Sequence, residues 1–123
     1  MKYKTPLHMK KLLREKGKLV GIYYRTETTD ENGITEYTYS DSPTIVYGVI
    51  YSTKGFRETW YEVGSEYEVD YLITLEATVT INNGDRIDIG DGIIVYVEEK
   101  VPRGSGFSTQ YWELLCNRIE GPA

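Results

Sequence analysis

Apolar and polar residues alternate along most of the chain after Lys18, with a period of two residues. This period is typical of β-strands, because successive side chains point to opposite faces of a sheet. The longest such stretch runs from Tyr71 to Asn82, where only Leu72 interrupts the alternation. The stretch is longer than a usual strand, so we expect it to bend across two sheets or to contain a bulge.

Turn residues divide the remaining pattern into short strands. Asn83-Gly84 and Asp91-Gly92 are typical of tight hairpin turns, and they predict a meander of three antiparallel strands. The Pro and glycines of Val101 to Gly106 predict a loop. Upstream, Asp30-Glu31-Asn32-Gly33 predicts a hairpin tip. The other expected strands cover residues 18–28, 34–39, 44–51, 86–89, 93–97 and 111–119.

The beginning of the chain has a different pattern, which predicts one short basic helix over residues 6–16. Thr5 suits the N-cap, and Pro6 is tolerated in a first helical turn. Gly17 suits the C′ position that ends a helix. The apolar stripe of this helix consists of Leu7, Met9, Leu12 and Leu13.

These patterns predict an all-β fold: a small antiparallel β-barrel or sandwich with a short N-terminal helix and a long projecting loop. We expect a single domain over 1–123, with a basic helical segment at 1–17, the β-barrel at 18–119 and the loop at 26–43. The loop is acidic and poor in aliphatic residues, so it cannot bury much surface and should project. The expected core contains Ile73, Leu75, Val79, Ile81, Ile87, Ile89, Val95 and Leu115.

The composition excludes several classes of protein. With 123 residues, 40% of them hydrophobic and 27% charged, the chain is neither collagenous nor of low complexity, and we expect no membrane span. A single cysteine cannot form an intramolecular disulfide, and the first residues contain no apolar signal region. We therefore expect a protein of a reducing compartment without an export signal.

Charge is distributed unevenly along the chain. Residues 1–25 contain eight Lys or Arg and one Glu, a charge of +7, whereas the remainder contains six and eighteen, a charge of −12. Together these give the net charge of −5. The asymmetry indicates a basic end that binds an acidic surface and a body that repels polyanions. The alternative is a basic helix face that is only solvated.

The sequence contains few candidates for catalytic or metal chemistry. His8 is the only histidine and lies in a lysine-rich segment, and Cys116 has no His or Cys nearby in the sequence. Asp85, Asp88 and Asp91 lack the spacing of a calcium loop and are better explained by turn chemistry. We therefore expect no enzymatic activity, no cofactor and no metal site.

The order of these features resembles the head-tail joining proteins of tailed bacteriophages, also called head completion or stopper proteins. The resemblance lies in Leu12-Leu13-Arg14, in the strand Leu19 to Arg25 followed by Thr29-Asp30-Glu31-Asn32-Gly33, and in the closing segments. Those closing segments are Tyr71 to Leu75, Asp85-Arg86-Ile87, Val95-Tyr96-Val97 and Tyr111 to Cys116. The basic helix is longer than the usual start of the family, and the basic strand expected before the meander is missing.

The resemblance implies a virion protein, made in the host cytoplasm, that docks under the portal or adaptor protein and assembles into a ring. It also implies a tail-side connector partner, passage of DNA without sequence-specific binding, and a role in retaining DNA and attaching the tail. The matching channel loop contains Glu27, Asp30, Glu31, Asn32, Gly33, Glu36 and Asp41. The expected interface with the portal or a neighbouring subunit contains Lys10, Lys11, Arg14 and Lys18. The alternative function is an OB-like nucleic-acid-binding module that uses these same basic residues.

Overall fold

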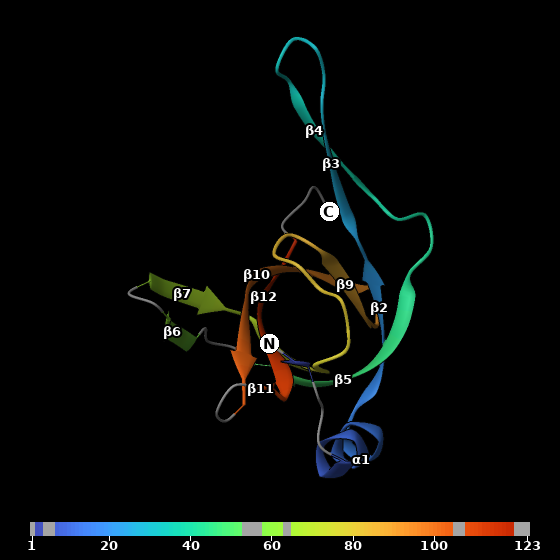
Figure 1. Cartoon of the computed structure of the whole chain (residues 1–123), viewed down its shortest axis with the longest axis vertical. Helices are drawn as coiled ribbons and strands as arrows, with labels where there is room; N and C mark the ends of the chain where they lie inside the picture. The colour runs from blue at the N-terminus through green and yellow to red at the C-terminus, as the bar shows by residue number, and fades with distance from the viewer. Residues whose placement is uncertain (1, 4–6, 53–57, 63–64, 105–107, 120–123) are drawn as a thin grey trace.

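The computed structural model describes residues 2–3, 7–52, 58–62, 65–104 and 108–119 of the chain (Figure 1). Its body is a closed barrel of six strands, in which each strand is antiparallel to both neighbours. The predicted all-β class is therefore confirmed. In order around the barrel, the strands are β10 (Ile93–Arg103), β12 (Tyr111–Arg118), β8 (Tyr71–Glu76), β5 (Thr44–Ser52), β2 (Lys18–Tyr23) and β9 (Arg86–Gly90).

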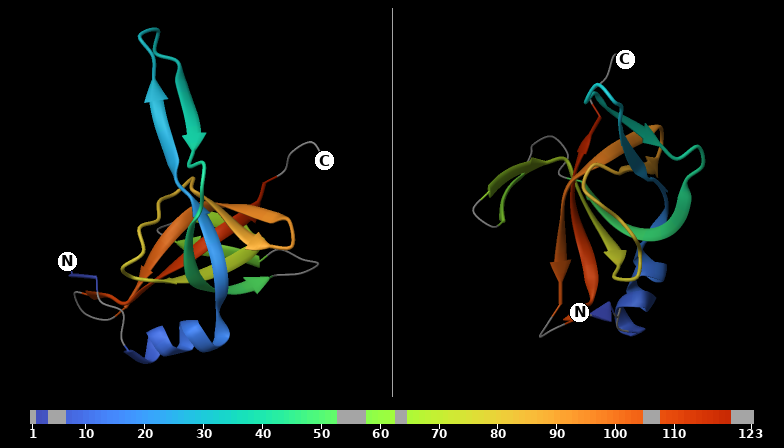
Figure 2. Two further views of the ribbon diagram at one scale, coloured as in Figure 1. Left: turned by 90° about the vertical axis from the view of Figure 1, so that its right-hand side faces the viewer. Right: turned by 45° about the horizontal axis from the view of Figure 1, so that its top comes forward.

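Four smaller elements surround the barrel. A two-stranded hairpin of β3 (Arg25–Thr29) and β4 (Thr35–Tyr39) extends away from it, and the helix α1 (Leu7–Lys16) lies at the opposite end of the molecule (Figures 1 and 2). We call the hairpin the arm. The other two elements are the hairpin of β6 (Glu58–Glu62) with β7 (Ser65–Val69) and the parallel pair of β1 (Lys2–Tyr3) with β11 (Ser108–Thr109).

The barrel encloses the main hydrophobic core, because the apolar face of each alternating strand points inward. Of the eight predicted core residues, all except Val79 are buried, and Val79 packs partly buried against the core. Leu115 nevertheless lies in a separate small cluster with Val69 and Val101. Its neighbours Leu114 and Cys116 belong to the barrel interior, so Leu115 is buried against the outside of the barrel.

The helix α1 agrees with the expected helix to within one residue at its start. It packs on the barrel next to β5, and its Leu13 is fully buried. Gly17 ends the helix and donates a hydrogen bond to the carbonyl oxygen of Leu13 at 2.9 Å. The predicted end of the helix at Gly17 is confirmed, although Gly17 is not among the described glycines with positive φ. Glycine is needed there because a Cβ atom would lie 2.9 Å from the carbonyl oxygen of Gly48.

The predicted long strand from Tyr71 to Asn82 is shorter in the structure. The strand β8 ends at Glu76, where its partner β12 also begins, and Val79 N–H bonds to the carbonyl oxygen of Glu76 in a turn. Residues 77–83 then cross one end of the barrel without a strand partner. Ala77 and Ile81 remain buried, so the alternation reflects packing over the barrel end rather than a continued strand.

Only one of the two predicted hairpins of the meander is present. Asp91 and Gly92 have φ values of 56° and 76° and join β9 to β10 as a tight hairpin, as predicted. Asn83-Gly84 does form a turn, but β8 and β9 are not paired: β8 lies between β5 and β12. The meander of three consecutive strands is therefore wrong.

The strand β10 is longer than predicted and contains a bulge. Its register with β12 shifts between Val97 and Glu99, which leaves Glu98 as an extra residue and reverses the faces of the residues that follow. The loop was predicted to begin at Val101, but residues 101–103 continue the strand, so this predicted start is wrong. Pro102 is tolerated there since β9 pairs only with residues 93–96 of β10, which leaves this part of β10 without a second neighbour.

Candidate functional site

The arm has no residue buried in the protein. All five residues of β3 are exposed, and so are all residues of β4 except the half-buried Tyr39. A two-stranded ribbon of this kind is marginally stable by itself, because it lacks a face packed on a core. The arm therefore has the exposure expected of a segment that contacts something other than its own barrel.

The tip of the arm is organised by Asp30. Its Oδ1 atom accepts hydrogen bonds from the N–H groups of Asn32 and Ile34, both at 2.9 Å. Gly33 adopts a φ of 80°, a conformation that favours glycine. The predicted hairpin tip is confirmed, and two of its residues, Asp30 and Gly33, have a structural function there.

The root of the arm is attached to the barrel through Asp85. This carboxylate is 2% exposed, and its two oxygen atoms accept hydrogen bonds from the N–H groups of Arg25 and Asn82, each at 2.8 Å. The turn that carries Asp85 is bonded in its own right to Val97 of β10, at 2.8 and 2.9 Å. The first residue of the arm is thus connected through one buried side chain to the barrel wall.

Two arginine side chains also stack on tyrosines at the root. The guanidinium of Arg25 lies 4.4 Å from the ring centre of Tyr37, and that of Arg86 lies 4.0 Å from the ring centre of Tyr39. Both tyrosines lie on one face of β4, together with Glu27 of β3. The opposite face of the arm carries Glu36. The backbone hydrogen bond between Asp30 and Ile34 extends the strand pairing by one residue, so Ile34 lies on the same face as Glu36. The arm therefore has one face stabilised by internal stacking and one face without it.

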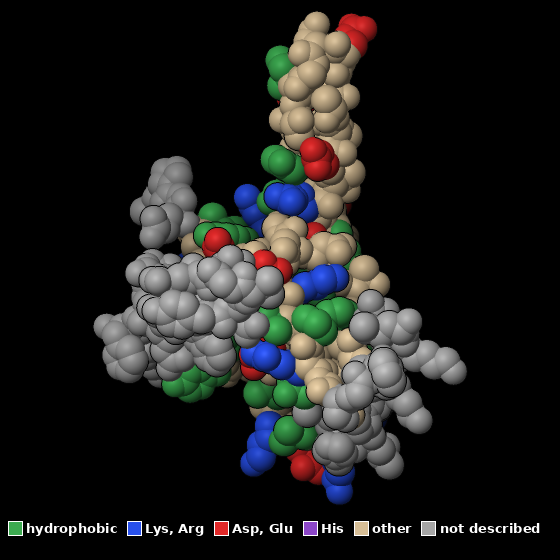
Figure 3. Space-filling model, turned by 60° about the vertical axis from the view of Figure 1, so that its left-hand side comes forward, with side chains coloured by type: hydrophobic (Ala, Val, Ile, Leu, Met, Phe, Trp, Pro, Cys, Tyr) green, Lys and Arg blue, Asp and Glu red, His purple; other side chains and the backbone are tan. Residues whose placement is uncertain are grey.

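The predicted channel-loop residues are brought together by this arm. Glu27 and Glu36 lie in its strands, and the tip contains Asp30, Glu31, Asn32 and Gly33. Asp41 lies in the bend after the arm, exposed like the others. Figure 3 shows acidic side chains along the arm and basic side chains at its root and at the far end of the molecule.

The predicted interface residues lie at that far end. Lys11 and Arg14 are exposed on α1, and Lys18 is exposed at the start of β2. Lys11 and Glu15 form an ion pair at 3.9 Å in which both side chains are more than half exposed, so it contributes little to stability. The side chain of Lys10 is outside the described part of the structure.

A surface that the sequence analysis missed lies beside this basic end. Leu19 of β2 and Ile45, Tyr47 and Tyr51 of β5 are 57%, 56%, 43% and 53% exposed. Leu19 and Tyr47 are direct cross-strand partners, and the three residues of β5 share one face, so the four side chains form one apolar stripe. Their sequence positions predicted strands, but only the closure of the barrel determines that this face points outward. Isolated exposed apolar residues are ordinary, whereas a continuous stripe is typical of interaction surfaces.

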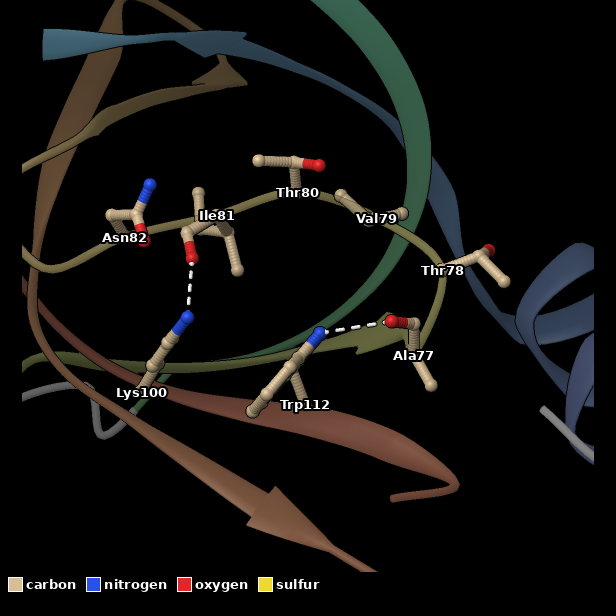
Figure 4. A pocket seen from close by; sticks show the side chains of 8 residues that line it. All are labelled: Ala77, Thr78, Val79, Thr80, Ile81, Asn82, Lys100 and Trp112. Carbon is tan, nitrogen blue, oxygen red and sulfur yellow. Dashed lines mark hydrogen bonds between the residues drawn. The ribbon is translucent and has the colours of Figure 1, made fainter. Parts of the chain in front are cut away.

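A small pocket of about 210 Å³ lies where residues 77–82 cross the barrel end (Figure 4). The Nζ atom of Lys100 lies 4.7 Å from the ring centre of Trp112 and donates a hydrogen bond to the carbonyl oxygen of Ile81 at 2.9 Å. Trp112 Nε1 donates to the carbonyl oxygen of Ala77 at 3.2 Å. These groups hold the crossing segment in place, and Lys100 is the only ionisable residue among those lining the pocket.

Other chemistry is limited within the described residues. Burial raises the pKa of the Cys116 thiol well above its usual range, which keeps the thiol protonated. No three described His, Cys, Asp or Glu side chains are close enough to hold a metal ion together. In the described part of the chain, no helix has both the length and the apolar character needed to cross a bilayer.

Comparison with known proteins gives little information about this chain. No family model matches the chain, and no curated protein matches it significantly. Among solved structures, it is similar to the phage-like element PBSX protein xkdH from Bacillus subtilis, at 17% identity and a TM-score of 0.49. The match covers 83% of this chain and 95% of that one. At this level, the similarity establishes neither the family nor the function of the chain.

Proposed function

We propose that this protein is a structural component of a phage head-tail connector, which docks under the portal, assembles into a ring and helps to retain packaged DNA and to attach the tail. The proposal combines the resemblance of the sequence to head-tail joining proteins with the distribution of surfaces on the barrel. The portal or adaptor protein and a tail-side connector protein are the partners it requires.

The projecting arm is the feature of the structure that supports this function most directly. Its strand residues lack a buried position, yet its root is bonded to the barrel wall through Asp85, so it projects in a defined direction. In a ring, the arms would extend toward the central channel. Acidic side chains such as Glu27 would then repel phosphates and let DNA pass without binding.

Electron microscopy tests this function directly. We expect negatively stained complexes of the protein with its cognate portal to show an added ring below the portal. Particles carrying an arm shortened across residues 29–36 should retain the folded barrel but lose packaged DNA. A protein that adds no density to the portal and has no effect on DNA retention would contradict the proposal.

A further inference from the structure

The arm and the apolar stripe are separate surfaces of the molecule and have complementary properties. The arm is acidic, whereas the stripe is adjacent to the basic segment formed by α1 and the start of β2 (Figures 1 and 2). Lys18 directly precedes Leu19 of the stripe, and α1 packs against β5, which supplies the other three residues of the stripe. Opposite charges beside an apolar surface are typical of protein interfaces.

The unstacked face of the arm is the one suited to such a contact. It carries Ile34, which is 57% exposed, and Glu36. Glu31 is an exposed residue of the turn at the tip. The other face is already occupied by the stacking of Arg25 and Arg86 on tyrosines. An exposed isoleucine with glutamates nearby is therefore complementary to the apolar stripe, which has lysine and arginine nearby.

We infer that the unstacked face of the arm docks on the apolar stripe and basic helix of a second copy of this chain. The two surfaces are different, so the contact is head-to-tail, and repetition of such a contact closes into a ring when the rotation allows. This inference rests on the proposed function for the ring itself and identifies the surfaces that form it. The stacked face, with Glu27, remains available to the channel.

The contact also gives the arm the packed face that it lacks in a single subunit. A ribbon exposed on both faces gains a packed face when it lies on a neighbouring barrel, and the apolar stripe loses its exposure to water. In such a contact, the acidic residues Asp30, Glu31 and Glu36 of the arm face Lys11, Arg14 and Lys18 of the next copy. These charges favour association of unlike surfaces and disfavour association of like surfaces.

Charge reversal on each surface tests the inference. Glu31→Lys with Glu36→Lys reverses the arm, and Lys11→Glu with Arg14→Glu reverses the helix. Each double variant should raise the Kd of self-association roughly tenfold or more, because like charges then face each other. Sedimentation velocity of the protein, alone and with the cognate portal, measures the effect. Asp88→Asn with Asp91→Asn removes the same number of acidic charges elsewhere and should leave association unchanged.

Mixing the two reversed variants is the decisive experiment. The basic arm of the arm-reversed variant then faces the acidic helix of the helix-reversed variant. The acidic arm of the helix-reversed variant faces the basic helix of the arm-reversed variant. Every contact again joins opposite charges, so the equimolar mixture should assemble as well as the unmodified protein. A contact between like surfaces would not be weakened in either variant alone, because its two sides carry the same charge before and after reversal, and binding to the portal alone would not be restored by mixing. Rings that form normally with either variant, or variants that fail to recover on mixing, would overturn the inference while leaving the proposed ring intact.

A second pair of variants tests the apolar part without changing any charge. Ile34→Ser on the arm and Ile45→Ser on the stripe should each weaken self-association several-fold, because each removes an exposed apolar side chain from the contact. Circular dichroism should show both variants folded, since both positions are exposed. Association that is unaffected by both substitutions would contradict docking of the arm on the stripe. Failure of the unmodified protein to form any ring would instead contradict the proposed function.

Discussion

The barrel and the arm are made of similar strands, yet they are stabilised in different ways. The barrel buries one face of every strand around a shared core, whereas the arm buries neither face and depends on hydrogen bonds and stacking at its root. Hydrophobic burial is the main favourable contribution to folding, so the barrel can be stable alone and the arm cannot. The arm is therefore held by the barrel mainly through its root, and its two faces stay exposed.

The largest change in stability should follow a substitution inside the barrel. Leu75→Ala removes a fully buried side chain and should lower the free energy of unfolding by about 2–5 kcal/mol, as measured by urea denaturation. The buried Cys116 thiol should react faster with a thiol reagent in this variant, because labelling requires the barrel to open. A loss below about 1 kcal/mol would show that the barrel core is less important than this comparison requires.

A smaller effect is expected at the connection between the two regions. Asp85→Ala leaves the N–H groups of Arg25 and Asn82 without their acceptor and should cost about 1–3 kcal/mol. Hydrogen exchange of the arm amides should accelerate more than that of β8 or β12. Asp85→Asn retains one acceptor oxygen and should be intermediate. Uniform acceleration across the whole chain would mean that Asp85 supports the barrel rather than the arm.

Shortening the arm should change stability less than either of these substitutions. Replacing residues 29–35 by Asn-Gly joins the cross-strand partners Thr28 and Glu36 by a two-residue turn and keeps the root contacts of Arg25 and Tyr39. We expect the free energy of unfolding to change by less than about 1 kcal/mol, in thermal or urea unfolding. A loss comparable to that of Leu75→Ala would show that the arm belongs to the cooperative barrel.

The smallest effect is expected at the basic helix. Lys11→Gln breaks an exposed ion pair with Glu15 and should alter the free energy of unfolding by less than about 0.5 kcal/mol. Urea denaturation at low and at high salt should give nearly the same difference between variant and unmodified protein. A larger, salt-sensitive change would mean that α1 contributes to folding through its charges.

Local signals in the sequence were sufficient for several parts of the fold. The hairpin tip at residues 30–33 and the Asp91-Gly92 turn were predicted because Asp, Asn and Gly determine backbone conformation within a few residues. The long strand from Tyr71 was wrong at its end because a strand stops where its partner stops, and β12 pairs with β8 only as far as Glu76. Alternation reports burial, which continues beyond that point at Ile81.

The candidate surfaces were predicted less completely, because they depend on contacts between residues that are far apart in the sequence. The acidic residues of the arm are close in sequence, so their proximity in space could be expected. Asp85 contacts an N–H group sixty residues away, and Arg86 stacks on Tyr39, which is 47 residues away. No local pattern specifies either pairing. The outward direction of Ile45 and Tyr47 likewise depends on how the barrel closes.

The position of β12 in the barrel has a consequence for synthesis of the protein. This strand lies between β8 and β10, although its residues follow both of them in the chain. Until Tyr111–Arg118 have left the ribosome, β8 and β10 each lack one neighbour, and the nascent chain exposes two open strand edges. Closure of the barrel must therefore wait for the translation of this strand, an interval in which the incomplete sheet is open to aggregation.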